Sequence, residues 1–148
     1  LRELCAVSQG RRGTWGADDV ILVSTNLNPR ILRVSSSGGE PTAITTPDVA
    51  QGERRHGQPA FLPDSRRFLY LSQTDQGSSV MVASLDGGPA VRLVASTTVA
   101  QYSKGHLLYL SGTTLTAQHA DSSARLANTS LWGDAQAASW LARGRLAK

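Results

Sequence analysis

The chain repeats one local pattern three times, and this repeat restricts the possible folds more than any other feature. Each copy begins with an aromatic residue, Trp15, Phe61 or Tyr102, followed by a short turn reading GADD, LPDS or SKG. Pro, Asp and Gly favour the backbone angles of tight reversals. An apolar run ending in serine comes next: VILVS, FLYLS and LLYLS. Short runs of β-branched and aromatic residues between turns predict buried strands rather than helices.

The second half of each copy continues with further strand-like runs. A third run occurs in every copy: ILRVS (31–35), VMVAS (80–84) and TLTAQ (114–118). Two copies then carry a double glycine, Gly38-Gly39 and Gly87-Gly88, which suits the positive φ of hairpin turns. A fourth run closes these two copies: TAIT (42–45) and VRLVA (91–95). Four short antiparallel strands per copy are therefore expected.

The spacing of the copies favours a propeller. The first two aromatic residues are 46 residues apart and the next two are 41 apart, and four-stranded propeller blades repeat every 40–45 residues or so. A β-sandwich also has evenly spaced strands, but it would not repeat this order of turns. We expect an all-β chain of three four-stranded propeller blades, a half propeller. The predicted units are residues 1–8 (outer strand of an incomplete blade), 9–50, 51–97 and 98–130 (the three blades), and 131–148 (a tail in which a short helix is expected).

The repeat resembles a known family. FLPDSRRFLYLS and WGADDVILVS resemble the WD-like repeats of TolB-type propellers, and ILRVSSSGGEPTAIT and GRRGTWGADD are similar to propellers fused to bacterial serine/threonine protein kinases. The resemblance covers about residues 1–127 and implies a six-bladed propeller. The sequence departs from the pattern at Asp19 and Ser65, which stand at the usual turn glycine, and in the third copy, which lacks the Pro-Asp and Gly-Gly turns. Kinase motifs are absent from the sequence, so kinase activity is not implied.

Three blades are too few to close a ring, because known propellers have about four to eight. An open arc leaves strand edges and apolar faces exposed at both ends, and such surfaces favour pairing with another chain. We therefore predict a homodimer that closes one six-bladed ring around a two-fold axis, with a small-molecule ligand in its central tunnel. Residues 1–8, LRELCAVS, could then add a strand to the partner's third blade. The alternative is a fragment of a longer propeller.

Composition limits the remaining functions. The chain has 148 residues, of which 40% are hydrophobic, typical of one globular domain. Its net charge of +4 comes mainly from scattered arginines, without the basic runs and interleaved aromatic residues that single-strand nucleic-acid binders use. No apolar run approaches the roughly 20 residues of a membrane span. With one cysteine, Cys5, and no secretory signal, the expected location is cytoplasmic.

The richest polar segment is QGERRHGQPAFLPD, which contains His56. We predict that it forms a loop leading into the innermost strand of the second blade, with His56 as a candidate catalytic residue. Glu53, Arg54, Arg55 and Asp48 are the candidate binding residues beside it. A solvated loop without a ligand is the other interpretation of this segment.

The two-fold axis of a dimer would bring two copies of His56 and Glu53 together. Such a set could hold zinc, calcium or manganese, which could activate water. The sequence thus leaves two functions open: a binding or assembly module, and, as the alternative, a small metal-dependent hydrolase of esters, lactones or phosphotriesters. His106 and His119 are assigned to surface or packing roles.

Overall fold

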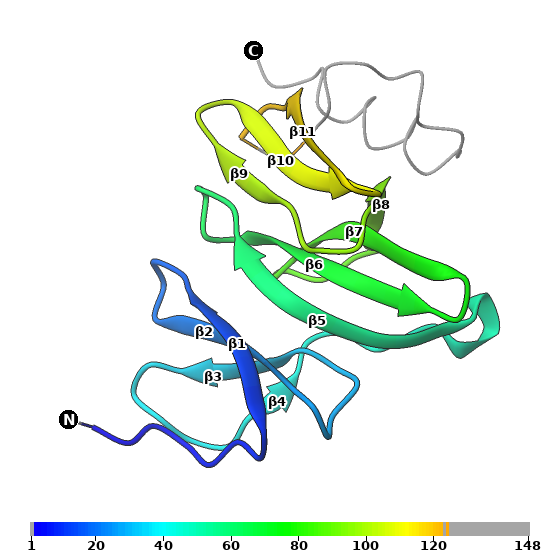
Figure 1. Cartoon of the computed structure of the whole chain (residues 1–148). Coiled ribbons are helices and arrows are strands. Elements are labelled where there is room, and N and C mark those ends of the chain that lie inside the picture. Colours follow the sequence, from blue (N-terminus) through cyan, green and yellow to red (C-terminus); the bar gives the residue numbers. More distant parts are fainter. Residues whose placement is uncertain (1, 123, 125–148) are drawn as a thin grey trace.

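The computed structural model describes residues 2–122 and 124, and this part of the chain is all-β without an α-helix. Its strands form three antiparallel sheets, each in chain order (Figure 1). The first sheet contains β1 (Gly10–Trp15), β2 (Val20–Thr25), β3 (Leu32–Ser35) and β4 (Thr42–Ala43). After the 3-10 turn η1 (Val49–Gln51), the second sheet contains β5 (Glu53–Phe61), β6 (Arg67–Thr74), β7 (Gly77–Ser84) and β8 (Val91–Ala95). The third sheet contains β9 (Gln101–Ser103), β10 (His106–Ser111) and β11 (Thr114–His119).

The prediction of an all-β chain built from three antiparallel sheets is confirmed. The third sheet has three strands among the described residues, although four were predicted. The last residues of the predicted third blade, 125–130, and the tail 131–148 lie outside the described part of the chain. The predicted run 42–45 is a strand only at Thr42–Ala43, but Ile44 continues the pairing, since its N–H donates to Ile31 O at 2.9 Å.

The predicted turns are present, and residues with positive φ occur in each of them. The turn between the first two strands of each sheet contains one non-glycine residue in the left-handed region: Asp19 (φ 57°), Ser65 (φ 53°) and Lys104 (φ 46°). Two of these, Asp19 and Ser65, stand where the resemblance predicts a turn glycine. All four residues of the double-glycine turns also have positive φ. The turn chemistry therefore fixes where each strand begins.

Strand register makes the three sheets comparable residue by residue. The second and third strands of each sheet pair through Val20 with Ser35, Arg67 with Ser84, and His106 with His119. Counting from these pairs, Leu22, Leu69 and Leu108 occupy one equivalent position. Side chains alternate between the two faces of a strand, so equivalent positions face the same way in each sheet.

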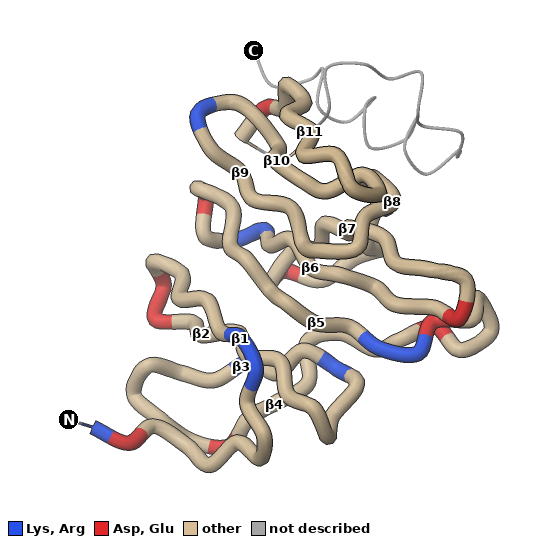
Figure 2. Tube along the Cα trace, viewed as in Figure 1, with Lys and Arg blue, Asp and Glu red and all other residues tan. Residues whose placement is uncertain are grey.

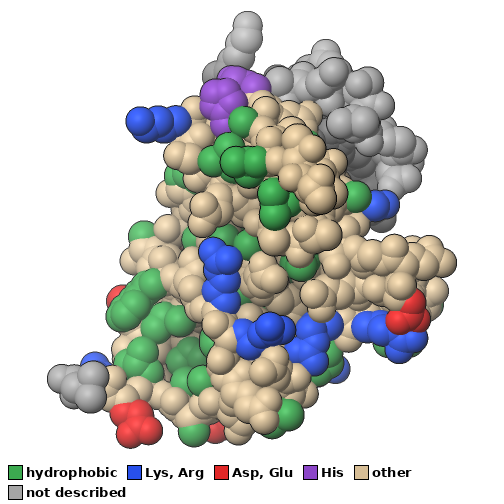
Figure 3. Space-filling model, viewed as in Figure 1, with side chains coloured by type: hydrophobic (Ala, Val, Ile, Leu, Met, Phe, Trp, Pro, Cys, Tyr) green, Lys and Arg blue, Asp and Glu red, His purple; other side chains and the backbone are tan. Residues whose placement is uncertain are grey.

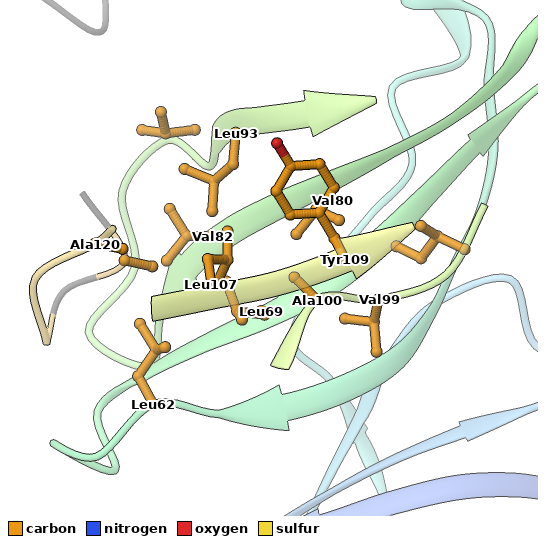
Figure 4. Close-up of a cluster of buried hydrophobic side chains, with 13 residues drawn as sticks. Leu62, Leu69, Val80, Val82, Leu93, Val99, Ala100, Leu107, Tyr109 and Ala120 are labelled. Carbon is orange, nitrogen blue, oxygen red and sulfur yellow. The ribbon is translucent and has the colours of Figure 1, made fainter. Parts of the chain in front are cut away.

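Two hydrophobic clusters join the sheets. Between the first and second sheets, the buried residues are Val20, Leu22, Ile31, Phe68 and Tyr70. Between the second and third, side chains of β6, β7 and β8 pack against Leu107 and Tyr109 of β10 (Figure 4). The middle sheet thus buries apolar side chains on both faces.

The segment before β1 lies along the first sheet without forming a strand in the described chain. Gly39 N–H donates to Leu4 O at 3.2 Å, and an Arg2 guanidinium N–H donates to Ser37 O at 2.6 Å. A Cβ atom on Gly38 would lie 2.8 Å from Leu4 O, so a glycine is needed for this approach. Figure 1 shows the segment at the end of the sheet stack, away from the second sheet.

Candidate functional site

The five residues predicted as a binding loop are built into regular structure. Asp48 caps η1, where its Oδ1 accepts hydrogen bonds from the Ala50 and Gln51 amides at 3.0 and 3.3 Å. Gly52 then reverses the chain at φ 77°, and the other four candidates, Glu53 to His56, are the first residues of β5. The expectation of a loop was wrong for these four, because strand pairing with β6 begins at Glu53.

His56 is buried between the first two sheets rather than exposed to solvent. The exposed fraction of His56 is 3%, and the centroid of its imidazole ring lies 4.7 Å from the centroid of the Tyr70 ring. His56 Nε2 is 3.0 Å from Glu53 Oε2, whereas the buried Nδ1 has no hydrogen-bond partner among the described residues. The other interpretation of the segment, a solvated loop, is therefore wrong at His56.

Glu53 connects this cluster to its surroundings. Its Oε1 accepts from Ser72 Oγ at 2.6 Å and its Oε2 accepts from the Asp48 amide at 2.7 Å. Burial by itself would raise the pKa of Glu53, but the hydrogen bonds from Asp48, Ser72 and His56 lower it below the usual value. Burial lowers the pKa of His56 despite the opposing effect of Glu53. The pair is consequently an ionised carboxylate that accepts a hydrogen bond from the Nε2–H of a neutral imidazole.

The two neighbouring arginines are used elsewhere. Arg54 forms an exposed ion pair with Asp75, in the turn between β6 and β7. Figure 2 shows basic positions at one end of β5 and an acidic position in the neighbouring turn between β6 and β7. The Arg55 guanidinium donates to Thr25 O and Asn26 O at 2.8 and 2.7 Å, at the end of β2. The structure thus brings Asp48, Glu53 and His56 together, but it directs both arginines away from them.

Hydrogen bonds beside this cluster connect the start of β5, in the second sheet, to the end of β2 and the residues after it, in the first sheet. Besides Arg55, the His56 amide donates to Pro29 O at 2.7 Å and the Gln58 amide donates to Ser24 Oγ at 3.3 Å. No group of three or more His, Cys, Asp or Glu side chains within the described residues is placed to hold a metal ion. Glu53 and His56 would supply two ligands that already bond to each other.

The outward face of the first sheet, meaning the face directed away from the second sheet, is apolar over a larger area than the His56 cluster occupies. It carries Trp15, Ile21, Val23 and Leu32, whose equivalents in the second sheet are Phe61, Phe68, Tyr70 and Met81. Those equivalents all belong to the cluster between the first and second sheets. Trp15, by contrast, is 62% exposed. Figure 3 shows hydrophobic side chains gathered at the surface over the first sheet.

The outward face of the third sheet is apolar in the same way. It carries Leu108, Leu110, Leu115 and Ala117, which are equivalent to Leu69, Leu71, Val80 and Val82. The exposed fraction of Leu115 is 69%, whereas that of Val80 is 0%. At one end of this face, the rings of His106 and His119 meet edge to face at 5.5 Å. The sequence predicted bare apolar faces at the ends of the arc, but not these residues.

No protein-family model, curated protein or solved structure matches the chain. Within the described residues, no helix has the length and apolar character needed to cross a membrane.

Proposed function

We propose that this chain is an assembly module, a half propeller that two copies complete. In this assembly, the outward face of the third sheet of each copy packs against the outward face of the first sheet of the other. Six sheets then surround one axis, a number within the range of about four to eight known for propellers. Both junctions are equivalent through a two-fold axis, so one pair of surfaces is sufficient.

One observation carries the proposal. The middle sheet buries apolar side chains on both of its faces, and each terminal sheet repeats the corresponding apolar pattern on a face that has no neighbouring sheet among the described residues. Leu115, at the position of the fully buried Val80, shows this most clearly. Exposed apolar faces of this kind favour association because burial removes them from water.

The molar mass in solution, measured by light scattering, tests the assembly. We expect the native protein in solution to have a molar mass twice that of one chain, which is 15.7 kDa. Leu115→Asp places a charge in the junction and is expected to give a species of one chain mass, because an unpaired buried charge is costly. Its far-ultraviolet circular dichroism should stay native-like, since Leu115 is exposed in the single chain.

Leu27→Asp is the matched control. Leu27 is 66% exposed, comparable to Leu115, but it lies in the connection between β2 and β3 instead of on either outward face. This variant should remain a dimer. A native chain of single mass at concentrations up to the millimolar range would contradict the proposal, as would a dimer that is indifferent to Leu115→Asp.

A ligand site in the tunnel of the closed ring is a further part of the proposal. The first strands of the first two sheets, β1 and β5, contact each other, and β1 contributes the exposed Arg11 and Arg12. These charges favour an anionic small molecule. None of the described contacts favours the alternative function, metal-assisted hydrolysis, over assembly, because His56 is enclosed and already bonded to Glu53.

A further inference from the structure

We infer that residues 4–8 of one copy form the fourth strand of the third sheet in a second copy, pairing with β11. This inference rests on the proposed dimer and specifies how its junction is closed. The second copy is the committed occupant of the β11 edge. Residues 125–148 of the same chain are the competing occupant, which the experiment below distinguishes.

The position of residues 4–8 in the repeat is that of a fourth strand. Trp15 pairs with Ile21 and Tyr102 pairs with Leu107, the second residue of the next strand in both cases. Residues 4–8 precede Trp15 by 7 to 11 residues, and β8 (Val91–Ala95) precedes Tyr102 by the same spacing. The connection between β4 and β5 is longer because it contains η1. Residues 4–8 therefore correspond to the last strand of a sheet that would precede the first one.

The structure holds this segment beside the face of the first sheet that the proposed dimer would bury. Its backbone is anchored to the Gly38-Gly39 turn through Leu4 O, on the side of the first sheet away from the second. Leu4, Cys5 and Val7 are half-buried there. Since the first sheet of one copy would adjoin the third sheet of the other, the segment can reach the partner's β11 while it keeps its contacts with the Gly38-Gly39 turn.

The pairing of β7 with β8 predicts the register. In that pair, Val82 opposes Val91, Met81 opposes Arg92 and Val80 opposes Val94. Transferred to β11 and the donated segment, the opposed pairs are Ala117 with Leu4, Thr116 with Cys5, and Leu115 with Val7. The exposed Leu115 would thereby gain an apolar cross-strand neighbour, which stabilises antiparallel pairs.

The single native cysteine makes this register testable in the full-length chain. In Thr116→Cys, the new thiol should oppose Cys5 of the second copy at a Cα separation of about 4.5–5.5 Å, as in any antiparallel pair. Disulfides form at Cα separations of roughly 4.4–6.8 Å. Mild oxidation should therefore convert most of the protein to a covalent dimer, seen as a band of twice the chain mass on a non-reducing gel.

Thr114→Cys is the control for register. It makes the same chemical change two residues earlier on β11, which moves the thiol about 7 Å along the strand and out of disulfide range of Cys5. We expect at least a tenfold slower cross-linking for this variant. Cys5→Ser combined with Thr116→Cys should also lose the rapid cross-link, which identifies Cys5 as the partner.

The outcomes separate this inference from the proposed function. Rapid covalent dimerisation of Thr116→Cys alone supports strand donation. A non-covalent dimer by light scattering that cross-links equally at both positions, or at neither, overturns strand donation but leaves the dimer intact. A disulfide within one chain would also overturn it. A native chain of single mass would remove the proposed dimer and strand donation together.

Discussion

His56 is the residue whose environment differs most from the expectation of an exposed loop. Its Nδ1 is buried without a partner, so a proton added there would find no acceptor among the described residues. Burial lowers the pKa of His56, and the hydrogen bond to Glu53 only partly opposes this. Burial also acts on Tyr70, which packs against the imidazole ring, but there it raises the pKa because the charged form of tyrosine is the deprotonated one. The low polarity of this position therefore favours a neutral imidazole.

This lowered pKa predicts that stability decreases as the pH falls below about 6.5, the ordinary histidine value. In that range the unfolded chain binds a proton that the folded chain does not, so protonation favours unfolding, by at most about 1.4 kcal/mol per pH unit. The measurement is the free energy of unfolding in urea at pH 7.5 and pH 5.5. Glu53, whose pKa is also lowered, loses its contribution only below about 4.3, outside this interval.

His56→Gln should reduce the pH dependence, because the glutamine amide can donate to Glu53 but does not titrate. Both variants are made in the single-chain Leu115→Asp background, where the outward face that carries His119 is free, and His119→Gln then serves as the control, since it removes an exposed histidine and leaves His56 in place. An unchanged pH dependence in His56→Gln would contradict the role given to this residue.

Among the elements, the double-glycine turns show how one sequence signal can serve two purposes. Gly38 and Gly87 both have positive φ, 92° and 88°. Nothing lies within 4 Å of a Cβ atom built on Gly87, whereas a Cβ on Gly38 would approach Leu4 O at 2.8 Å. The first turn thus shapes a hairpin and also holds the N-terminal segment.

This difference predicts unequal effects of two identical substitutions. Gly38→Ala and Gly87→Ala should each lower the free energy of unfolding by about 1–2 kcal/mol, since alanine is strained at positive φ. Only Gly38→Ala should also displace residues 2–8, and we expect it to weaken the proposed dimer at least tenfold more than Gly87→Ala. Sedimentation equilibrium measures both dissociation constants. Equal constants would argue against a contribution of the N-terminal segment to the junction.

For the whole molecule, the main feature is that burial is unevenly distributed. The middle sheet is covered on both sides, but the terminal sheets expose large apolar residues, among them Trp15 and Leu115. A chain that buries these faces only on association should gain stability by mass action. Its stability would then depend on protein concentration.

We therefore expect the thermal unfolding midpoint to rise with protein concentration between about 1 and 100 μM, because the proposed dimer would be favoured at the higher concentration. Circular dichroism follows the transition. Leu115→Asp should unfold at a concentration-independent midpoint, and Leu27→Asp should behave like the native chain. A native midpoint that does not change over this range would be inconsistent with stabilisation by dimerisation.

The strands and turns could be predicted from the sequence because they depend on local chemistry. Apolar runs such as FLYLS, the turn residues Asp19 and Ser65, and the double glycines each act over a few neighbouring residues. They were sufficient for the all-β class and the three-sheet organisation.

The character of the polar segment was decided only by tertiary structure. Whether His56 is solvated or enclosed depends on Tyr70 from the next strand and on the first sheet packing over both. Whether Arg55 faces a ligand or the backbone depends on where β2 ends. Likewise, Leu115 and Val80 look alike in the sequence, and only the order in which the sheets stack leaves one exposed and the other buried. Local propensity determines the elements, whereas burial depends on contacts between residues far apart in the chain.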